Sequence, residues 1–367
     1  MAAYLSRASR VYLGTMTFGW EQTSSFINDD VASIMCRSAF DAGINTLDSA
    51  RIYSGGKTEP IVGSCLAAMR PEVLRVTTKA HPSQPGGLTA EGIRAQLSDS
   101  LTAFGCSKVD ELYLHQPDTE ADLFESLEAV NSLVEEGLVG AVGMSNYHVS
   151  EVARALDLCA ANGWAAPSVY QGLYNPLNRR AEEELLPFLK LSGVKFVAYN
   201  ALAAGLLTGK HTPPSSAPQS VLPGRFKDNP NYLPRFYTDA NFKALSCLDG
   251  ALLEVKREQP PLDLVAATYA WLLHHSALGP DDGILMGASS PEQLSANLAA
   301  LDQADGGKDN TKAPVMDQSL LAAFDEAWRV VRDEGGGGFP YWRSYSRDHP
   351  GRESMDPGAG YAAHGPK

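Results

Sequence analysis

The sequence predicts an α/β protein folded as a (β/α)8 barrel, the TIM-barrel class. Short apolar runs alternate with amphipathic segments through most of the 367 residues, and eight such runs can be distinguished. This alternation requires a parallel sheet, because each crossover helix covers one face of the strands. Eight parallel strands are the number that closes a barrel of this class. We therefore expect a single domain over residues 1–343.

The expected strands follow one another at intervals that leave room for a helix between each pair. The amphipathic segment 89–105 shows how these helices are bounded: Thr89 suits an N-cap, and Gly105 suits the residue that ends the helix. The eight strand-like runs cover residues 11–15, 44–50, 73–80, 109–116, 138–146, 168–172, 194–200 and 283–289.

Two regions break the alternation. Residues 203–238 form a long connection after the seventh run, rich in Gly, Pro and Ser, and loops of this length tend to be functional or disordered. Residues 344–367 have the composition of a flexible C-terminal tail. We therefore expect a chain truncated after Tyr345 to fold and act normally.

Composition excludes several classes of partner. The formal net charge is −13, and the 30 Lys and Arg form no basic stripe, so nucleic acid is not an expected partner. No run of about 18 apolar residues predicts a membrane span, and the N-terminus lacks the apolar core of a secretory signal. The five scattered cysteines suit reduced thiols, so we expect a cytoplasmic protein.

Polar residues close the second, third and fourth expected strands. Asp48 and Lys79 end neighbouring strands, so each is placed to neutralise the other's charge. Tyr53 follows five residues after Asp48, and a tyrosine beside a lysine has a lowered pKa. His115 ends the fourth strand and is able to contact a substrate oxygen. Together these four groups make a proton donor with an oxygen anchor, as carbonyl reduction requires.

Each of these residues also has an ordinary structural explanation when it is taken alone. A strand-end histidine is commonly a hydrogen-bonded structural residue, a strand-end aspartate commonly caps the next helix, and Tyr53 could simply pack in a loop. Only the ordered set at successive strand ends favours catalysis.

Other nucleotide and metal motifs are missing from the sequence. The glycines of 137–143 run into a strand and not out of one, so they do not form a dinucleotide fingerprint. Residues 205–211 lack the spacing and the Ser or Thr of a phosphate loop. A metal-dependent barrel hydrolase would need an H-x-H motif, which does not occur, so no metal site is expected.

Six segments, taken together, resemble the aldo-keto reductase superfamily: LDSARIYSGGKTE, TTKAHP, DELYLHQPD, GMSNY, YQGLYN and AYNALAAGLLTGK. Within it the chain is most similar to the aflatoxin-aldehyde and succinic-semialdehyde reductase subgroup, over about residues 11–343. The resemblance implies that Tyr53 is the general acid, that Asp48 and Lys79 lower its pKa, and that His115 orients the carbonyl.

The same resemblance implies NADPH as cofactor, with the 203–238 connection folded over it. Gly287, Ala288 and Gln293 stand where many relatives have a Lys-Ser pair and an Arg, so Lys210 and Arg225 would supply the charge for the 2′-phosphate. Ala201 stands where the subgroup usually has Pro. The alternative for Asn146 and Gln171 is that they cap the loops they open. The implied cofactor-binding residues are Asp48, Ser145, Asn146, Gln171, Tyr199, Asn200, Leu202, Gly205, Leu206, Lys210, Arg225, Gly287, Ser289, Ser290, Gln293 and Asn297.

The expected substrates are aldehydes, with ketones and dicarbonyls as further classes. Arg343, in the aromatic-basic island FPYWRSY, and Arg235 are expected to bind a distal carboxylate, so short carboxylated aldehydes are the preferred substrates. Trp20, Tyr53 and His115 complete the expected substrate site. The subgroup's habit implies a homodimer. The alternative function is a cofactor-binding regulatory subunit, because the chain also resembles potassium-channel β subunits.

Overall fold

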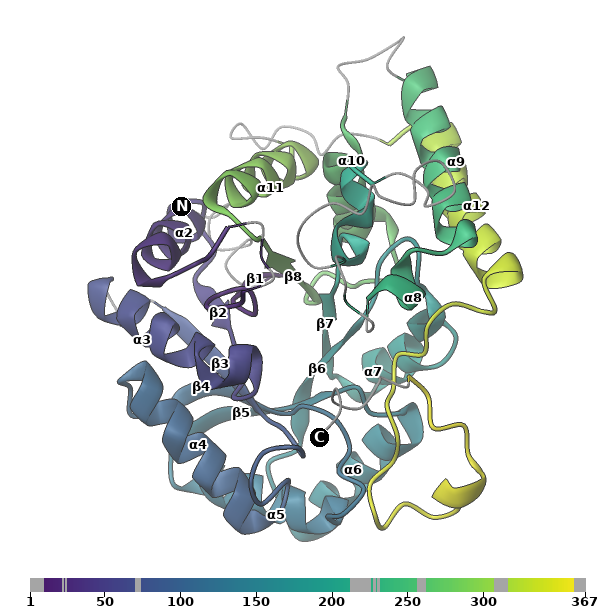
Figure 1. Ribbon diagram of the computed structural model, residues 1–367. Helices are drawn as coiled ribbons and strands as arrows, with labels where there is room; N and C mark the ends of the chain where they lie inside the picture. Colours follow the sequence, from purple (N-terminus) through teal and green to yellow (C-terminus); the bar gives the residue numbers. More distant parts are fainter. Residues whose placement is uncertain are drawn as a thin grey trace.

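The computed structural model describes residues 10–21, 23, 25–69, 74–211, 226, 229, 232–255, 262–306 and 316–359. Eight parallel strands close into a barrel in the order of the sequence. All eight correspond to predicted strands, and Figure 1 shows helices arranged around them. The strands are β1 (Val11–Gly14), β2 (Thr46–Asp48), β3 (Arg75–Ala80), β4 (Val109–Leu114), β5 (Val139–Ser145), β6 (Pro167–Leu173), β7 (Lys195–Tyr199) and β8 (Gly283–Gly287).

The helices cover the outside of the barrel and bury one large apolar core against the strands. Glycine permits the closest approach between them: a Cβ on Gly63 of α3 would lie 2.1 Å from the carbonyl oxygen of Ala103 in α4. The helices are α2 (Asp29–Asp41), α3 (Thr58–Ala68), α4 (Ala90–Phe104), α5 (Leu123–Glu135), α6 (Val149–Asn162), α7 (Leu185–Ser192), α8 (Leu233–Phe236), α9 (Asp239–Val255), α10 (Leu264–Ala270), α11 (Pro291–Ala304) and α12 (Gln318–Glu334).

Helix α4 has the predicted ends. The Thr89 side chain accepts a hydrogen bond from the Gly92 N–H, and Gly105 ends the helix with a left-handed φ of 67°. The long connection after β7 contains the short helices η4 (Ala203–Thr208) and α8, and both stand beside the barrel mouth.

The C-terminal segment differs from the expectation of a flexible tail. Residues 344–359 lie against α5 and α6 (Figure 1, yellow) and do not leave the barrel. The Ser346 N–H and hydroxyl both donate to the buried Glu151 carboxylate, and Arg347 pairs with Asp122. Composition missed this because the ion pairs and hydrogen bonds of the segment join residues far apart in the sequence and leave no apolar periodicity. Residues 360–367 lie outside the described residues.

Candidate active site

A cavity of about 670 Å³ opens at the carboxyl ends of the strands, where barrels of this class place their sites. Its wall combines strand ends, the 199–211 segment, the start of α11 and Arg343, which directly precedes the C-terminal segment. The predicted residues that line it are Trp20, Asp48, Tyr53, His115, Ser145, Asn146, Gln171, Tyr199, Asn200, Leu202, Gly205, Lys210, Gly287, Ser289, Ser290, Gln293 and Arg343.

A fully buried ion pair forms the floor of this cavity. Lys79 Nζ lies 2.7 Å from Asp48 Oδ1 and donates a second hydrogen bond, also 2.7 Å, to the Ser49 carbonyl oxygen. The other Asp48 oxygen accepts from Thr77 Oγ1 at 3.0 Å and from Gln171 Nε2 at 2.8 Å. The two charges are therefore balanced and hydrogen-bonded, as burial requires. Burial lowers the pKa of Lys79, and Asp48 opposes this effect.

Tyr53 stands above the pair, at the start of the short helix η1 (Tyr53–Gly56). Lys79 Nζ lies 5.2 Å from the centre of its ring. The expected lowering of its pKa is wrong for this structure: burial, followed by the Asp48 carboxylate, raises the pKa of Tyr53 well above its ordinary value. Burial is the larger of the two causes, because it disfavours the charged phenolate. Tyr53 therefore keeps its proton at neutral pH.

His115 lies next to Tyr53, with the two rings edge to face and their centres 5.8 Å apart. Burial lowers its pKa well below the ordinary value, and the nearby His81, Lys79 and Arg343 add to this effect. The ring is therefore neutral at pH 7. Within the described part of the chain, His115 Nδ1 is buried without a hydrogen-bond partner.

The ends of β5 and β7 are joined through Asn146. Its side-chain amide donates to the His115 carbonyl oxygen at 2.8 Å and to Ser145 Oγ at 2.9 Å. Its Oδ1 accepts from the Tyr199 hydroxyl at 2.8 Å. Asn146 adopts a left-handed φ of 61°, which Asn tolerates better than most residues. The structure thus brings the predicted nicotinamide-binding residues together, although the Asn146 amide is already engaged with the protein.

The other end of the cavity is bounded by the N-terminus of α11. Ser290 caps this helix by accepting from the Gln293 N–H, and Gln293 Oε1 accepts from the Ser289 N–H and hydroxyl. Helix N-termini attract phosphate groups, and Lys210 lines the same cavity. Glu292 also lines it and opposes an anion there.

Two of the predicted cofactor residues that the structure describes are not in the cavity wall. Leu206 is fully buried, and Asn297 is buried with its side-chain amide donating to the Gly287 carbonyl oxygen at 3.2 Å. These two residues therefore lie beneath the residues that line the cavity and pack against them. Arg225 lies outside the described residues.

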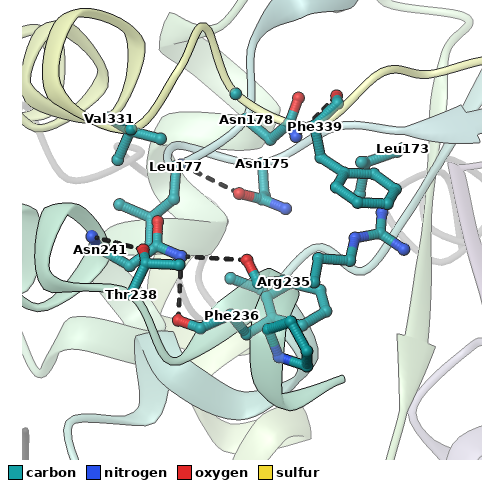
Figure 2. Close-up of a pocket in the computed structure, with 14 residues that line it drawn as sticks. Leu173, Asn175, Leu177, Asn178, Arg235, Phe236, Thr238, Asn241, Val331 and Phe339 are labelled. Carbon is teal, nitrogen blue, oxygen red and sulfur yellow. Dashed lines mark hydrogen bonds between the residues drawn. The ribbon is translucent and has the colours of Figure 1, made fainter. Parts of the chain in front are cut away.

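The two predicted substrate arginines are in different places. Arg343 lines the cavity, with its backbone N–H donating to the Asn146 carbonyl oxygen at 2.8 Å and its guanidinium to Gln116 Oε1 at 3.3 Å. Arg235 instead lines a separate pocket of about 220 Å³, where its guanidinium stacks 3.7 Å from the centre of the Phe339 ring (Figure 2). The sequence could not distinguish these positions, because both arginines lie beside aromatic residues.

Sequence reasoning missed His81, which lines the cavity and packs against His115. The available signal was its position two residues after Lys79, just beyond the end of β3. Residues in that position enter the loops that build the site.

Comparisons with known proteins agree with this geometry. Residues 10–305 match the model of the Aldo/keto reductase family. The chain is 36% identical over 329 residues to aflatoxin B1 aldehyde reductase member 2 of Rattus norvegicus, which covers 88% of this chain and 85% of the rat protein. It is 34% identical over 343 residues to human aldo-keto reductase family 7 member A3, with 91% and 98% covered. An aldo-keto reductase of Pseudocercospora fijiensis is 34% identical over 292 residues, with 78% and 93% covered.

Proposed function

The chain belongs to the aldo/keto reductase family, and from this premise we propose that it reduces aldehydes to alcohols with NADPH as cofactor. The observation that carries the proposal is the neutralised Lys79–Asp48 pair beneath Tyr53 and His115 at one end of a large cavity. Members of this family generally use a nicotinamide cofactor. The hydride is the chemistry that such a cofactor supplies when it is bound.

The protein's own groups deliver the proton. An ordinary tyrosine is protonated at neutral pH, and burial raises the pKa of Tyr53 further, so Tyr53 carries a proton that it can donate. Neutral His115 adds a hydrogen bond to the carbonyl oxygen without adding charge. When Tyr53 gives up its proton, the ammonium of Lys79 stabilises the phenolate from below.

The cavity suits a long dinucleotide. About 670 Å³ lies within the range of cofactor pockets, and the wall extends from Tyr53 to the N-terminus of α11. Ser145, Asn146, Gln171 and Tyr199 would hold the nicotinamide end. One N–H of the Gln171 amide donates to Asp48, and its carbonyl oxygen would accept from the N–H of a carboxamide.

Preference for NADPH over NADH rests on Lys210 and Arg225, and Glu292 opposes it. We expect the Lys210→Ala variant to bind NADPH about tenfold or more weakly, the scale of one charge-assisted contact, and NADH almost as before. Calorimetric titration of both cofactors measures this. Equal weakening of both would place Lys210 away from the 2′-phosphate.

Steady-state turnover of an aldehyde panel with each cofactor tests the whole proposal. Tight cofactor binding without turnover of any aldehyde would favour the regulatory alternative. The panel should include ketones and dicarbonyls as well as short carboxylated aldehydes, for which Arg343 is the proposed anchor.

A cytoplasmic location and a homodimer are further parts of the proposal. Among the described residues, no helix is long and apolar enough to cross a membrane. Light scattering of the purified protein tests the dimer.

A further inference from the structure

One side chain of the cavity wall has no part in the proposed chemistry. His81 follows directly after β3, and its ring is perpendicular to that of His115, with an interplanar angle of 89° and ring centres 5.0 Å apart. His115 therefore lies between two rings, because Tyr53 contacts it edge to face as well.

The protein holds His81 firmly. Its backbone N–H donates to Gln96 Oε1 at 2.8 Å, and the Gln96 amide donates back to its carbonyl oxygen at 3.3 Å. Its ring Nδ1 accepts from the Ser83 N–H at 3.0 Å and lies 2.8 Å from Ser83 Oγ. A backbone N–H can only donate, so Nδ1 carries no proton and neutral His81 is protonated on Nε2. Both the position and the tautomer of His81 are thus fixed.

His115 is held differently. A catalytic or metal-binding histidine is usually oriented by a hydrogen bond to its second ring nitrogen. His115 Nδ1 is buried without such a bond in the described part of the chain. Ring packing is therefore the contact that can supply this orientation, and the rings that pack against His115 among the described residues are those of Tyr53 and His81.

We propose that His81 is a positioning residue, whose anchored ring holds His115 in its orientation beside Tyr53. The proposal rests on the proposed reduction for its effect on turnover, but the contact itself can be tested without any substrate. The other titratable groups facing His115 are Lys79 and Arg343, besides Tyr53 and His81. Both are cations, so a charged His81 would disfavour protonation of His115 still further.

Two substitutions of His81 test whether its effect on His115 requires a ring. His81→Ala removes the ring and leaves His115 free to rotate, so kcat should fall roughly tenfold; misplacement by about 1 Å costs up to ~10². His81→Phe keeps a planar ring against His115 but loses the hydrogen bond from Ser83, so kcat should fall clearly less than in His81→Ala. Cofactor Kd should be unchanged in both. His275→Ala, on the exposed end of η6 (Trp271–His275), is the matched control.

A second readout is the NMR titration of the His115 ring in the cofactor-free protein. Both His81 variants lose a neighbouring group that lowers the pKa of His115, so this pKa should rise in both, while His275→Ala leaves it unchanged. Unaltered kcat in His81→Ala, or equal losses in the Ala and Phe variants, would overturn the proposal. If wild type reduces no aldehyde, the proposed function fails, and an unchanged His115 pKa in both variants would then contradict a contact between the two rings.

Discussion

The floor of the cavity and the C-terminal segment are built in opposite ways. Asp48 and Lys79 end adjacent strands, so backbone pairing alone brings them together, and both side chains are 0% exposed. The C-terminal segment reaches the cavity through contacts with distant residues, such as the pair of Arg347 (49% exposed) with Asp122 (36% exposed). Buried pairs are costly to break, whereas exposed pairs contribute little and are screened by salt.

This difference indicates which residues can be substituted without loss of the fold. The floor depends on the fold itself, so a substitution there should damage both stability and chemistry. The C-terminal segment carries Arg343 to the cavity without taking part in the barrel. Substitutions in it should therefore alter the choice of substrate and leave the reaction itself intact.

The largest expected effect is on the chemistry directly above the floor, at Tyr53. Tyr53→Phe removes only the donated proton, so kcat should fall by about 10²–10⁴ while cofactor binding and thermal stability are retained. The matched control is Tyr341→Phe, which removes a hydroxyl that donates to Glu184 at the base of the C-terminal segment; its turnover of a neutral aldehyde should stay near wild type. Undiminished reduction by Tyr53→Phe would show that the proton comes from elsewhere.

Next is the stability of the buried pair. Lys79→Met leaves the Asp48 carboxylate uncompensated, so the free energy of unfolding should fall by about 3–5 kcal/mol. Adding Asp48→Asn removes the stranded charge and should recover part of this loss. Urea denaturation of the two single variants and the double variant measures the coupling. Simple additivity of the single losses would mean that the pair does not act as a unit.

The next prediction concerns substrate choice at Arg343, beside the C-terminal segment. In Arg343→Ala, kcat/KM for a short carboxylated aldehyde should fall roughly ten- to a hundredfold, since a charge-assisted contact contributes about 1.5–3 kcal/mol. A neutral aldehyde of equal length should be affected little. Parallel losses on both substrates would remove Arg343 from carboxylate recognition.

The docking of the segment should depend on pH through Glu151. Burial raises its pKa to about 7, against 4.5 for an ordinary glutamate. Between these values the folded protein holds a proton that the unfolded chain has released, so this contribution to stability is present below pH 4.5 and is lost as pH rises through 7. Glu151→Gln should flatten that slope in urea unfolding, whereas Glu128→Gln, at an exposed position of α5, should keep it. An equal slope in wild type and Glu151→Gln would contradict this assignment.

The smallest effect is expected at Arg347. Arg347→Ala removes an exposed ion pair, so the melting temperature should fall slightly at low salt. At ~1 M salt, where the screening length is about 3 Å, the difference from wild type should vanish. The deficit of Lys79→Met should persist at both salt concentrations, because its pair is buried. If the loss of melting temperature in Arg347→Ala were the same at both salt concentrations, the ion pair would not be the contact that stabilises this part of the segment.

The floor of the cavity could be predicted from the sequence, whereas the docking of the C-terminal segment could not. Strand periodicity placed Asp48, Lys79 and His115 at strand ends, and the fold then brings these ends to one rim, so the barrel and its floor were predictable. Arg235 and Arg343 stand in similar aromatic surroundings in the sequence, and only packing separates them into two pockets. The docked segment was missed because ion pairs between residues more than 190 positions apart leave no local pattern.

Asn146 joins the wall of the cavity to the C-terminal part of the chain. Its side chain binds the Tyr199 hydroxyl and the carbonyl oxygen of His115, while its own carbonyl oxygen holds the backbone of Arg343. We therefore expect a ligand that binds beside Tyr199 and moves Asn146 to move the backbone of Arg343 as well. Thermodynamic linkage then requires reciprocity. If a bound cofactor changes the affinity for a carboxylated substrate by some factor, the bound substrate changes the affinity for the cofactor by the same factor.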